Sequence, residues 1–192
     1  TDFLTQYMAK KFGLNRSDYH LLPVDADMTF INAMRAHRIV AGMTTEPTAS
    51  ELLSTGEAKV LIDLRTEAGT REALGGHYPA GCLYMRAAWV NAHADAARKL
   101  THAFVRALQY IHTHSAEQIV AQLPRSYYEK RKALYVHALK AYQFTFSVDG
   151  RMPADGPRTV LTVMSAIDPS VKATDIDLSK TYTTAYLDDA EK

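Results

Sequence analysis

The side chains best suited to hold a ligand follow a short apolar run, residues 39–43, which has the composition of a buried strand. Thr45 and Glu46 come next, and Pro47 then opens a predicted helix, because proline is favoured in a first helical turn. A hydroxyl, a carboxylate and unpaired backbone N–H groups therefore gather where a strand gives way to a helix. In open α/β sheets ligands bind beyond the carboxyl ends of strands, so we expect a binding cleft here. Helix capping is an equally good interpretation of the same residues.

Three other places have a similar character. Asp25, Ala26 and Asp27 lie between a predicted strand and a helix, and two carboxylates so close suit an amine or a cation better than a bare anion. Thr1 and Asp2 precede the first helix, where a hydroxyl and free N–H groups can hold an anion. Tyr78, at the start of a later strand, can line a pocket. At these three places the simpler interpretation, capping for the acidic positions and packing for the tyrosine, is preferred.

The sequence contains no arrangement typical of a metal site or of covalent catalysis. His112 and His114 are two residues apart and do not share a helical face, which makes them poor joint ligands. His-x-x-x-His, Gly-x-Ser-x-Gly, Walker-type and Gly-x-Gly-x-x-Gly motifs are all missing. The single cysteine, Cys82, lies in an apolar run and is predicted to be a buried small hydrophobe. We therefore expect no metal, no cofactor and no enzymatic activity.

The composition is that of an ordinary globular protein and shows no bias toward nucleic-acid binding. The 192 residues suffice for one domain or one and a half, with 47% apolar and 22% charged residues. The net charge of +1 steers the chain toward neither nucleic acid nor an anionic membrane. The densest basic run, residues 130–132, is predicted to be a solvated helix face. No apolar run approaches the ~20 residues of a membrane-spanning helix.

The elements that must position these residues change in character along the chain. The first third alternates predicted helices with strands over residues 19–24, 39–43 and 59–64, and another strand follows at residues 81–86. This order predicts an α/β fold with a largely parallel sheet covered by helices. After residue 90 the pattern is almost entirely helical. Predicted segments there are residues 92–114, a helix opened by the Ser115–Gln118 capping box, residues 126–142, a helix beginning at Pro157 and a short helix within residues 178–187.

Short motifs in a fixed order extend over nearly the whole chain. They are residues 1–4 (TDFL), 11–14 (KFGL), 25–28 (DADM), 45–47 (TEP), 78–79 (YP), 89–95 (WVNAHAD), 149–153 (DGRMP) and 177–183 (DLSKTYT). This set resembles the solute-binding proteins of ABC importers of the nitrate/sulfonate/taurine type, related to the pyrimidine-precursor binders of thiamine synthesis. Three departures occur: Val40 and Ala94 replace an aspartate and a proline, and residues 25–27 replace a glycine-rich loop.

The resemblance implies a periplasmic binding protein type II-like fold in which a solute is held between two lobes. Residues 1–80 would form the α/β domain of lobe two, and residues 81–192 a crossover strand and helices that return to lobe one, most of which is not in this chain. The implied function is the substrate-binding component of an ABC importer for a small anionic or nitrogen-containing solute, such as nitrate, a sulfonate, taurine or a pyrimidine precursor. The implied ligand-binding residues are Thr1, Asp2, Asp25, Ala26, Asp27, Thr45, Glu46 and Tyr78.

The resemblance also implies a membrane permease as partner and a periplasmic location, either free or as an extracytoplasmic lipoprotein. Because the opposing wall of the cleft would be missing, we expect weak or no ligand affinity. Because the helices of residues 92–167 would lack the sheet that they cover, we expect their exposed apolar surface to favour dimerisation or domain swapping. One alternative is an enzyme of the same fold in thiamine-pyrimidine biosynthesis that uses iron and consumes a histidine, although His20, His37 and Cys82 lack the spacing of a ligand set. Another is a ligand-sensing regulatory domain, which would require a fused DNA-binding segment that the sequence does not contain.

Overall fold

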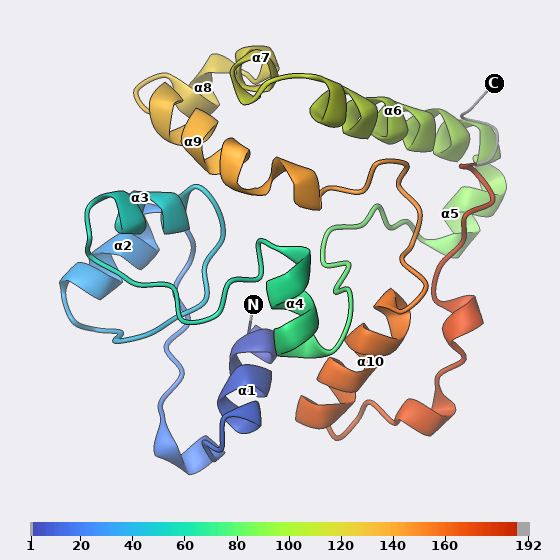
Figure 1. The fold of residues 1–192 in the computed structure, drawn as a ribbon. Coiled ribbons are helices and arrows are strands. Elements are labelled where there is room, and N and C mark those ends of the chain that lie inside the picture. The colour runs from blue at the N-terminus through green and yellow to red at the C-terminus, as the bar shows by residue number, and fades with distance from the viewer. Residues whose placement is uncertain (1, 188–192) are drawn as a thin grey trace.

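The computed structural model describes residues 2–187, and the regular elements of this range are all helical (Figure 1). The α-helices are α1 (Asp2–Lys11), α2 (Met28–Arg35), α3 (Thr48–Ser54), α4 (Glu67–Leu74), α5 (Ala87–Ala92), α6 (Ala94–Thr113), α7 (Ala116–Gln122), α8 (Arg125–Tyr128), α9 (Lys132–Tyr142) and α10 (Gly156–Ile167). Short 3-10 helices are η1 (Arg16–Asp18), η2 (Gln143–Thr145), η3 (Ala173–Asp175) and η4 (Leu178–Lys180). Within residues 2–187 no helix has the length and apolarity to cross a membrane.

Most predicted helices are confirmed, often to within a few residues. α1 ends before Gly13, which adopts the positive φ of 85° expected of a glycine after a helix. α6 occupies the predicted segment of residues 92–114, and both bonds of the Ser115–Gln118 capping box form at the start of α7. The helix predicted in the tail is wrong in extent, because only the short turn η4 forms there.

The four predicted strands are not found in the described part of the chain, so the predicted parallel sheet does not form there. Residues 39–43, 59–64 and 81–86 contain neither a helix nor a strand, and residues 19–24 are likewise irregular. Several of their apolar side chains face solvent, including Val40 (91% exposed) and Tyr84 (87% exposed). A strand needs a neighbouring strand to satisfy its backbone N–H and C=O groups, and these segments have none beside them. Cys82 in the last segment is exposed, so the prediction of a buried cysteine is wrong.

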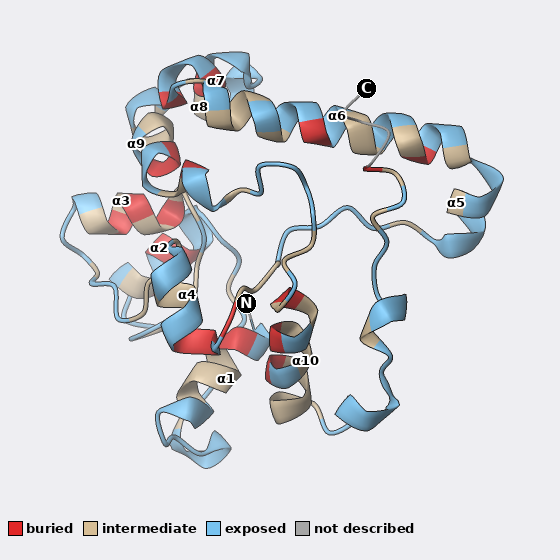
Figure 2. Cartoon of the chain, turned by 45° about the vertical axis from the view of Figure 1, so that its right-hand side comes forward, coloured by how far each residue is buried: buried red, intermediate tan, exposed pale blue. Residues whose placement is uncertain are grey.

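Burial is divided among three separate apolar clusters, visible as separate red patches in Figure 2. The first joins α1, α4 and α10 through Leu4, Leu74 and Val163. The second joins α7 and α9 through Val120 and Leu139. The third joins α2 and α3 and consists of Phe30, Ile31 and Leu52. Each cluster is small, because the elements form a loose arrangement rather than two complete layers around one core.

The first cluster brings distant parts of the chain together. α10 packs against α1, and the Lys10 ammonium donates a 2.9 Å hydrogen bond to the Ala166 carbonyl oxygen at the end of α10. Partly buried Met43, Leu64 and Tyr78 pack on the same cluster. The predicted division at residue 80 stays a prediction, but a helix from the second range contributes to the core of the first.

Candidate functional site

Glu46 is the most buried of the predicted ligand-binding carboxylates, with a side chain that is 5% exposed. One oxygen, Oε2, accepts a 3.0 Å hydrogen bond from the Ser50 backbone N–H in the first turn of α3. The other, Oε1, accepts a 2.8 Å hydrogen bond from the Arg65 guanidinium. Glu46 therefore caps α3 and forms an ion pair, and both of its oxygens are occupied.

Arg65 links this carboxylate to a second one. Its guanidinium donates to both oxygens of Asp63, at 2.9 and 2.8 Å, and this pairing lowers the pKa of Asp63 and raises the pKa of Arg65. Burial, followed by the Glu46 carboxylate, raises the pKa of Tyr142 at the end of α9. The negative charge of Glu46 thus acts on a side chain from the second half of the chain.

Two hydroxyl groups beside Glu46 are buried without hydrogen-bond partners among the described residues. They are Thr44 Oγ1, two residues before Glu46, and Ser50 Oγ, on the first turn of α3. A buried hydroxyl without a partner costs free energy, so each of these atoms is available to a small polar molecule or water.

Asp27 takes part in a contact that joins the α2–α3 pair to α9. Its backbone N–H donates a 2.8 Å hydrogen bond to Thr48 Oγ1 at the start of α3. Its carboxylate does not cap α2; instead, Oδ1 accepts a 2.9 Å hydrogen bond from the Arg131 guanidinium. The same guanidinium donates to the Glu51 carboxylate on α3, so one cation holds two carboxylates, and this pairing, first with Asp27, raises the pKa of Arg131.

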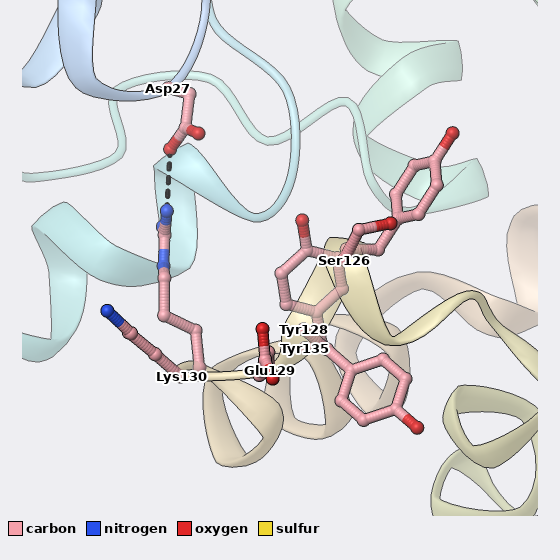
Figure 3. A pocket seen from close by; sticks show the side chains of 8 residues that line it. Asp27, Ser126, Tyr128, Glu129, Lys130 and Tyr135 are labelled. Atoms are coloured by element: carbon pink, nitrogen blue, oxygen red, sulfur yellow. Dashed lines mark hydrogen bonds and ion pairs between the residues drawn. The ribbon is translucent and has the colours of Figure 1, made fainter.

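A hollow of about 540 Å³ opens beside this contact (Figure 3). Asp27 forms one side, and residues of α8, of the first turn of α9 and of the segment that connects them form the rest. The lining consists of Asp27, Ser126, Tyr127, Tyr128, Glu129, Lys130, Arg131 and Tyr135. Its size lies within the range of roughly 300–1,000 Å³ that is typical of small-molecule sites.

The other predicted site residues are not brought to this hollow. Asp2 is exposed at the start of α1, where it accepts a 3.0 Å hydrogen bond from Gln6. Asp25, Ala26 and Thr45 are exposed, and the Thr45 carbonyl oxygen accepts the Ala49 N–H in the first turn of α3. Tyr78 packs on the α1–α4–α10 cluster, where burial raises its pKa. Thr1 lies outside the described residues. Among the described residues, Asp27 and Glu46 both bond to the first turn of α3, but of these two Asp27 alone lines the hollow.

Sequence reasoning missed Arg131, the three tyrosines and Arg65. Residues 130–132 were predicted to be a solvated helix face, but the Arg131 side chain is only 30% exposed and lies between two carboxylates. The run Ser126-Tyr127-Tyr128 is the one signal that could have indicated a ligand-lining segment, because aromatic side chains dominate small-molecule sites. No group of three or more His, Cys, Asp or Glu side chains suited to a metal ion occurs within residues 2–187.

Comparisons with known proteins assign the chain to a family. A solved structure of a protein from Bordetella bronchiseptica RB50 matches 99% of this chain with a TM-score of 0.91 and 33% sequence identity. This chain spans 60% of that protein's length. A comparison with curated proteins gives no match. The sequence model of the NMT1-like family matches residues 1–124, well over half of the chain, in agreement with the motifs that resemble nitrate/sulfonate/taurine-type binding proteins, and the chain therefore belongs to the NMT1-like family.

Proposed function

We propose that this chain is part of the substrate-binding component of an ABC importer and that it holds its solute in the hollow between Asp27 and the α8–α9 segment. The observation that carries the proposal is the hollow itself, because it combines a suitable volume with tyrosines and charged groups from two distant parts of the chain. Membership of the NMT1-like family supports a binding role rather than an enzymatic one.

The arrangement also suits a protein that closes on its ligand. α2 and α3 share their own apolar cluster, and α7 and α9 share another. The contact between these two groups is made by α3 and α9 and includes the Arg131 ion pairs. A solute in the hollow would touch both groups, so its binding would favour the arrangement in which they are close.

The finer features of the proposal follow from the family. The complete protein would have two lobes of the periplasmic binding protein type, would function outside the cytoplasmic membrane and would pass its solute to a membrane permease. The solute would be a small anionic or nitrogen-containing molecule.

A ligand screen tests this function. The chain is mixed with sodium nitrate, taurine, ethanesulfonate, an aminopyrimidine and choline, and its thermal unfolding is recorded with each. We expect at least one compound to raise the Tm of the native chain, because binding to the folded state stabilises it. The increase should be lost in Tyr135→Ala and kept in Arg35→Met, which alters an ion pair away from the hollow. An unchanged Tm with every compound would contradict the proposal.

A further inference from the structure

We infer that the hollow beside Asp27 binds a ligand through a positively charged nitrogen, and that Arg131 occupies this position when no ligand is bound. The inference rests on the proposed function, since it names the chemical class of solute for the same hollow. It goes against the simple expectation of a bare anion such as nitrate.

The charges around Arg131 are the first argument. Its guanidinium lies between Asp27 and Glu51, so two negative groups share one positive group. The carboxylate of Asp27 is 54% exposed and uses Oδ1 for Arg131. The group of three therefore carries a net negative charge and keeps a carboxylate at the edge of the hollow, where it can accept a hydrogen bond from an ammonium or guanidinium that takes the place of Arg131.

The tyrosines are the second argument. Tyr127, Tyr128 and Tyr135 all line the hollow, and Tyr128 and Tyr135 also pack on the α7–α9 cluster. Aromatic faces attract cations, and sites that hold quaternary ammonium groups are built from several such rings. Tyr128 already has a cation beside it, because the Lys132 ammonium lies 5.9 Å from the centre of its ring. A lining that combines tyrosines with the Asp27 carboxylate is suited to a cationic nitrogen.

The same lining is poorly suited to a bare anion. Arg131 has both terminal nitrogens on carboxylates, which leaves Lys130 as the lining cation for an incoming anion. Asp27 and Glu129 belong to the same lining and would repel that anion. For a cation the balance is reversed. It is attracted by Asp27 and Glu129, and once Arg131 has moved away it is repelled by Lys130 in the lining and by Lys132 beside Tyr128.

Arg131 then acts as an internal competitor. A ligand cation must displace the guanidinium from Asp27 before it can bind, so the apparent affinity falls by the fraction of molecules in which Arg131 is in place. Removal of the guanidinium should therefore strengthen the binding of a cation. If Arg131 instead contacted an anionic ligand, removal of its guanidinium would weaken the binding of that anion.

The test uses choline chloride and methylguanidinium chloride as cationic probes and sodium nitrate and ethanesulfonate as anionic probes, measured by calorimetry at low ionic strength. Proteins are the native chain, Arg131→Met, and the double variant Arg131→Met with Glu51→Gln. The double variant removes one charge of each sign, so that it keeps the net charge and leaves no unpaired Glu51 if the single variant does not fold. Arg35→Met is the matched control, because Arg35 also makes a two-pronged pair with one glutamate, Glu57, away from the hollow.

We expect the cationic probes to bind the double variant about tenfold more tightly than the native chain, and a further Asp27→Asn change to abolish the gain. The Arg35→Met variant should bind as the native chain does. Equal or weaker binding of the cations by both Arg131 variants would overturn the inference, as would tighter binding of nitrate or ethanesulfonate. If an anionic probe binds the native chain and the cations bind no variant, the inference fails while the proposed function stands; if no probe and no screened solute binds any variant, both fail.

Discussion

At the residue scale, the pair formed by Glu46 and Arg65 shows how a buried carboxylate is supplied with hydrogen-bond donors. The Glu46 side chain is almost fully buried, and its two oxygens accept from the Ser50 N–H and from Arg65. Burial of an unpaired carboxylate would be costly, so Arg65 contributes mainly by preventing that cost.

We expect Arg65→Met to lower the free energy of unfolding by about 3 kcal/mol, because it leaves Glu46 buried without its cation. Urea unfolding followed by circular dichroism measures the change. Arg35→Met is the control, since its pair with Glu57 is solvent-exposed and should contribute little. Equal losses in the two variants would show that burial of Glu46 does not determine the effect.

Gly69 tests a second local feature, the close approach of α4 to the Asp63–Arg65 turn. A Cβ atom at this position would lie 2.0 Å from the Asp63 carbonyl oxygen, and a backbone atom cannot rotate away. We expect Gly69→Ala to destabilise the protein by about 2 kcal/mol, since overpacking outweighs the roughly 1 kcal/mol that alanine gains over glycine in a helix. Gly81→Ala is the control, because nothing lies within 4 Å of its added Cβ. Denaturation curves that coincide for native protein and Gly69→Ala would contradict this prediction.

The sequence indicated single residues of the candidate site, but it did not indicate which side chains they contact. Glu46 and Asp27 were predicted because they stand at helix starts, a local signal that spacing reveals. Arg131 was not, because its contacts with Asp27 and Glu51 span 104 and 80 residues. No pattern within a short window encodes a contact of that length, so the composition of residues 130–132 suggested a solvated face instead.

At the element scale, the helices were predictable and the strands were not. Periodicity and capping are properties of one segment, and α6 and α7 follow them closely. A strand exists only if another segment pairs with it, so apolar runs such as residues 39–43 and 59–64 predict strands without determining that they pair. In the described structure these runs have no ladder partner, and the expected sheet is replaced by irregular extended chain.

The start of α7 gives an element-scale prediction. Ser115 Oγ accepts from the Gln118 N–H, and the Gln118 side chain accepts from the Ser115 N–H. We expect Ser115→Ala to cost about 1 kcal/mol, the usual effect of a lost N-cap, while Ser115→Asp keeps most of the stability because aspartate also caps. Thermal unfolding of the two variants beside the native chain checks this; equal Tm values for alanine and aspartate would contradict it.

The junction between α4 and α10 should be sensitive to acid. Asp155 at the start of α10 bonds to His77 at 2.7 Å and to Arg71 at 3.2 Å, and Glu67 bonds to Arg71 at 3.0 Å. His77 lowers the pKa of Asp155 below its ordinary value of 3.8, and Arg71 lowers the pKa of Glu67 below 4.5. A carboxylate with a lowered pKa in the folded state contributes stability that is present above its unfolded pKa and is lost as the pH falls through the folded pKa.

We therefore expect the Tm to fall as the pH is lowered below about 4.5, and the fall to be smaller in Asp155→Asn, which lacks one of the titrating groups. Thermal unfolding between pH 7 and pH 3 measures both curves. Because these groups are exposed, 0.5 M salt should weaken the effect, as expected from a Debye length of roughly 4 Å under that condition. Identical pH profiles for the native chain and Asp155→Asn would show that the junction does not titrate.

At the scale of the whole molecule, apolar surface stays exposed because the three apolar clusters are small. α6 illustrates it: Ala97 and Val105 are buried, whereas Leu100 and Phe104 are 39% and 51% exposed. Ala96, Ala103 and Ala107 lie on the same exposed side of the helix. The apolar face of α6 is thus wider than the surface that covers it.

An uncovered apolar helix face of this kind favours association, so we expect the chain to form concentration-dependent oligomers through α6. Sedimentation velocity over a hundredfold range of concentration, about 1 to 100 μM, measures this, and an interface of that strength corresponds to roughly −6 to −8 kcal/mol of association free energy.

The pair Leu100→Gln and Phe104→Gln should shift the chain toward monomer without loss of helical circular dichroism, because both residues are exposed. Val40→Gln and Leu61→Gln are the controls, because they change exposed apolar side chains outside α6. They distinguish an interface on this helix from nonspecific hydrophobic association. If the α6 changes leave the sedimentation profile as it was while the changes at positions 40 and 61 reduce association, the irregular segments, rather than the helix, form the contact.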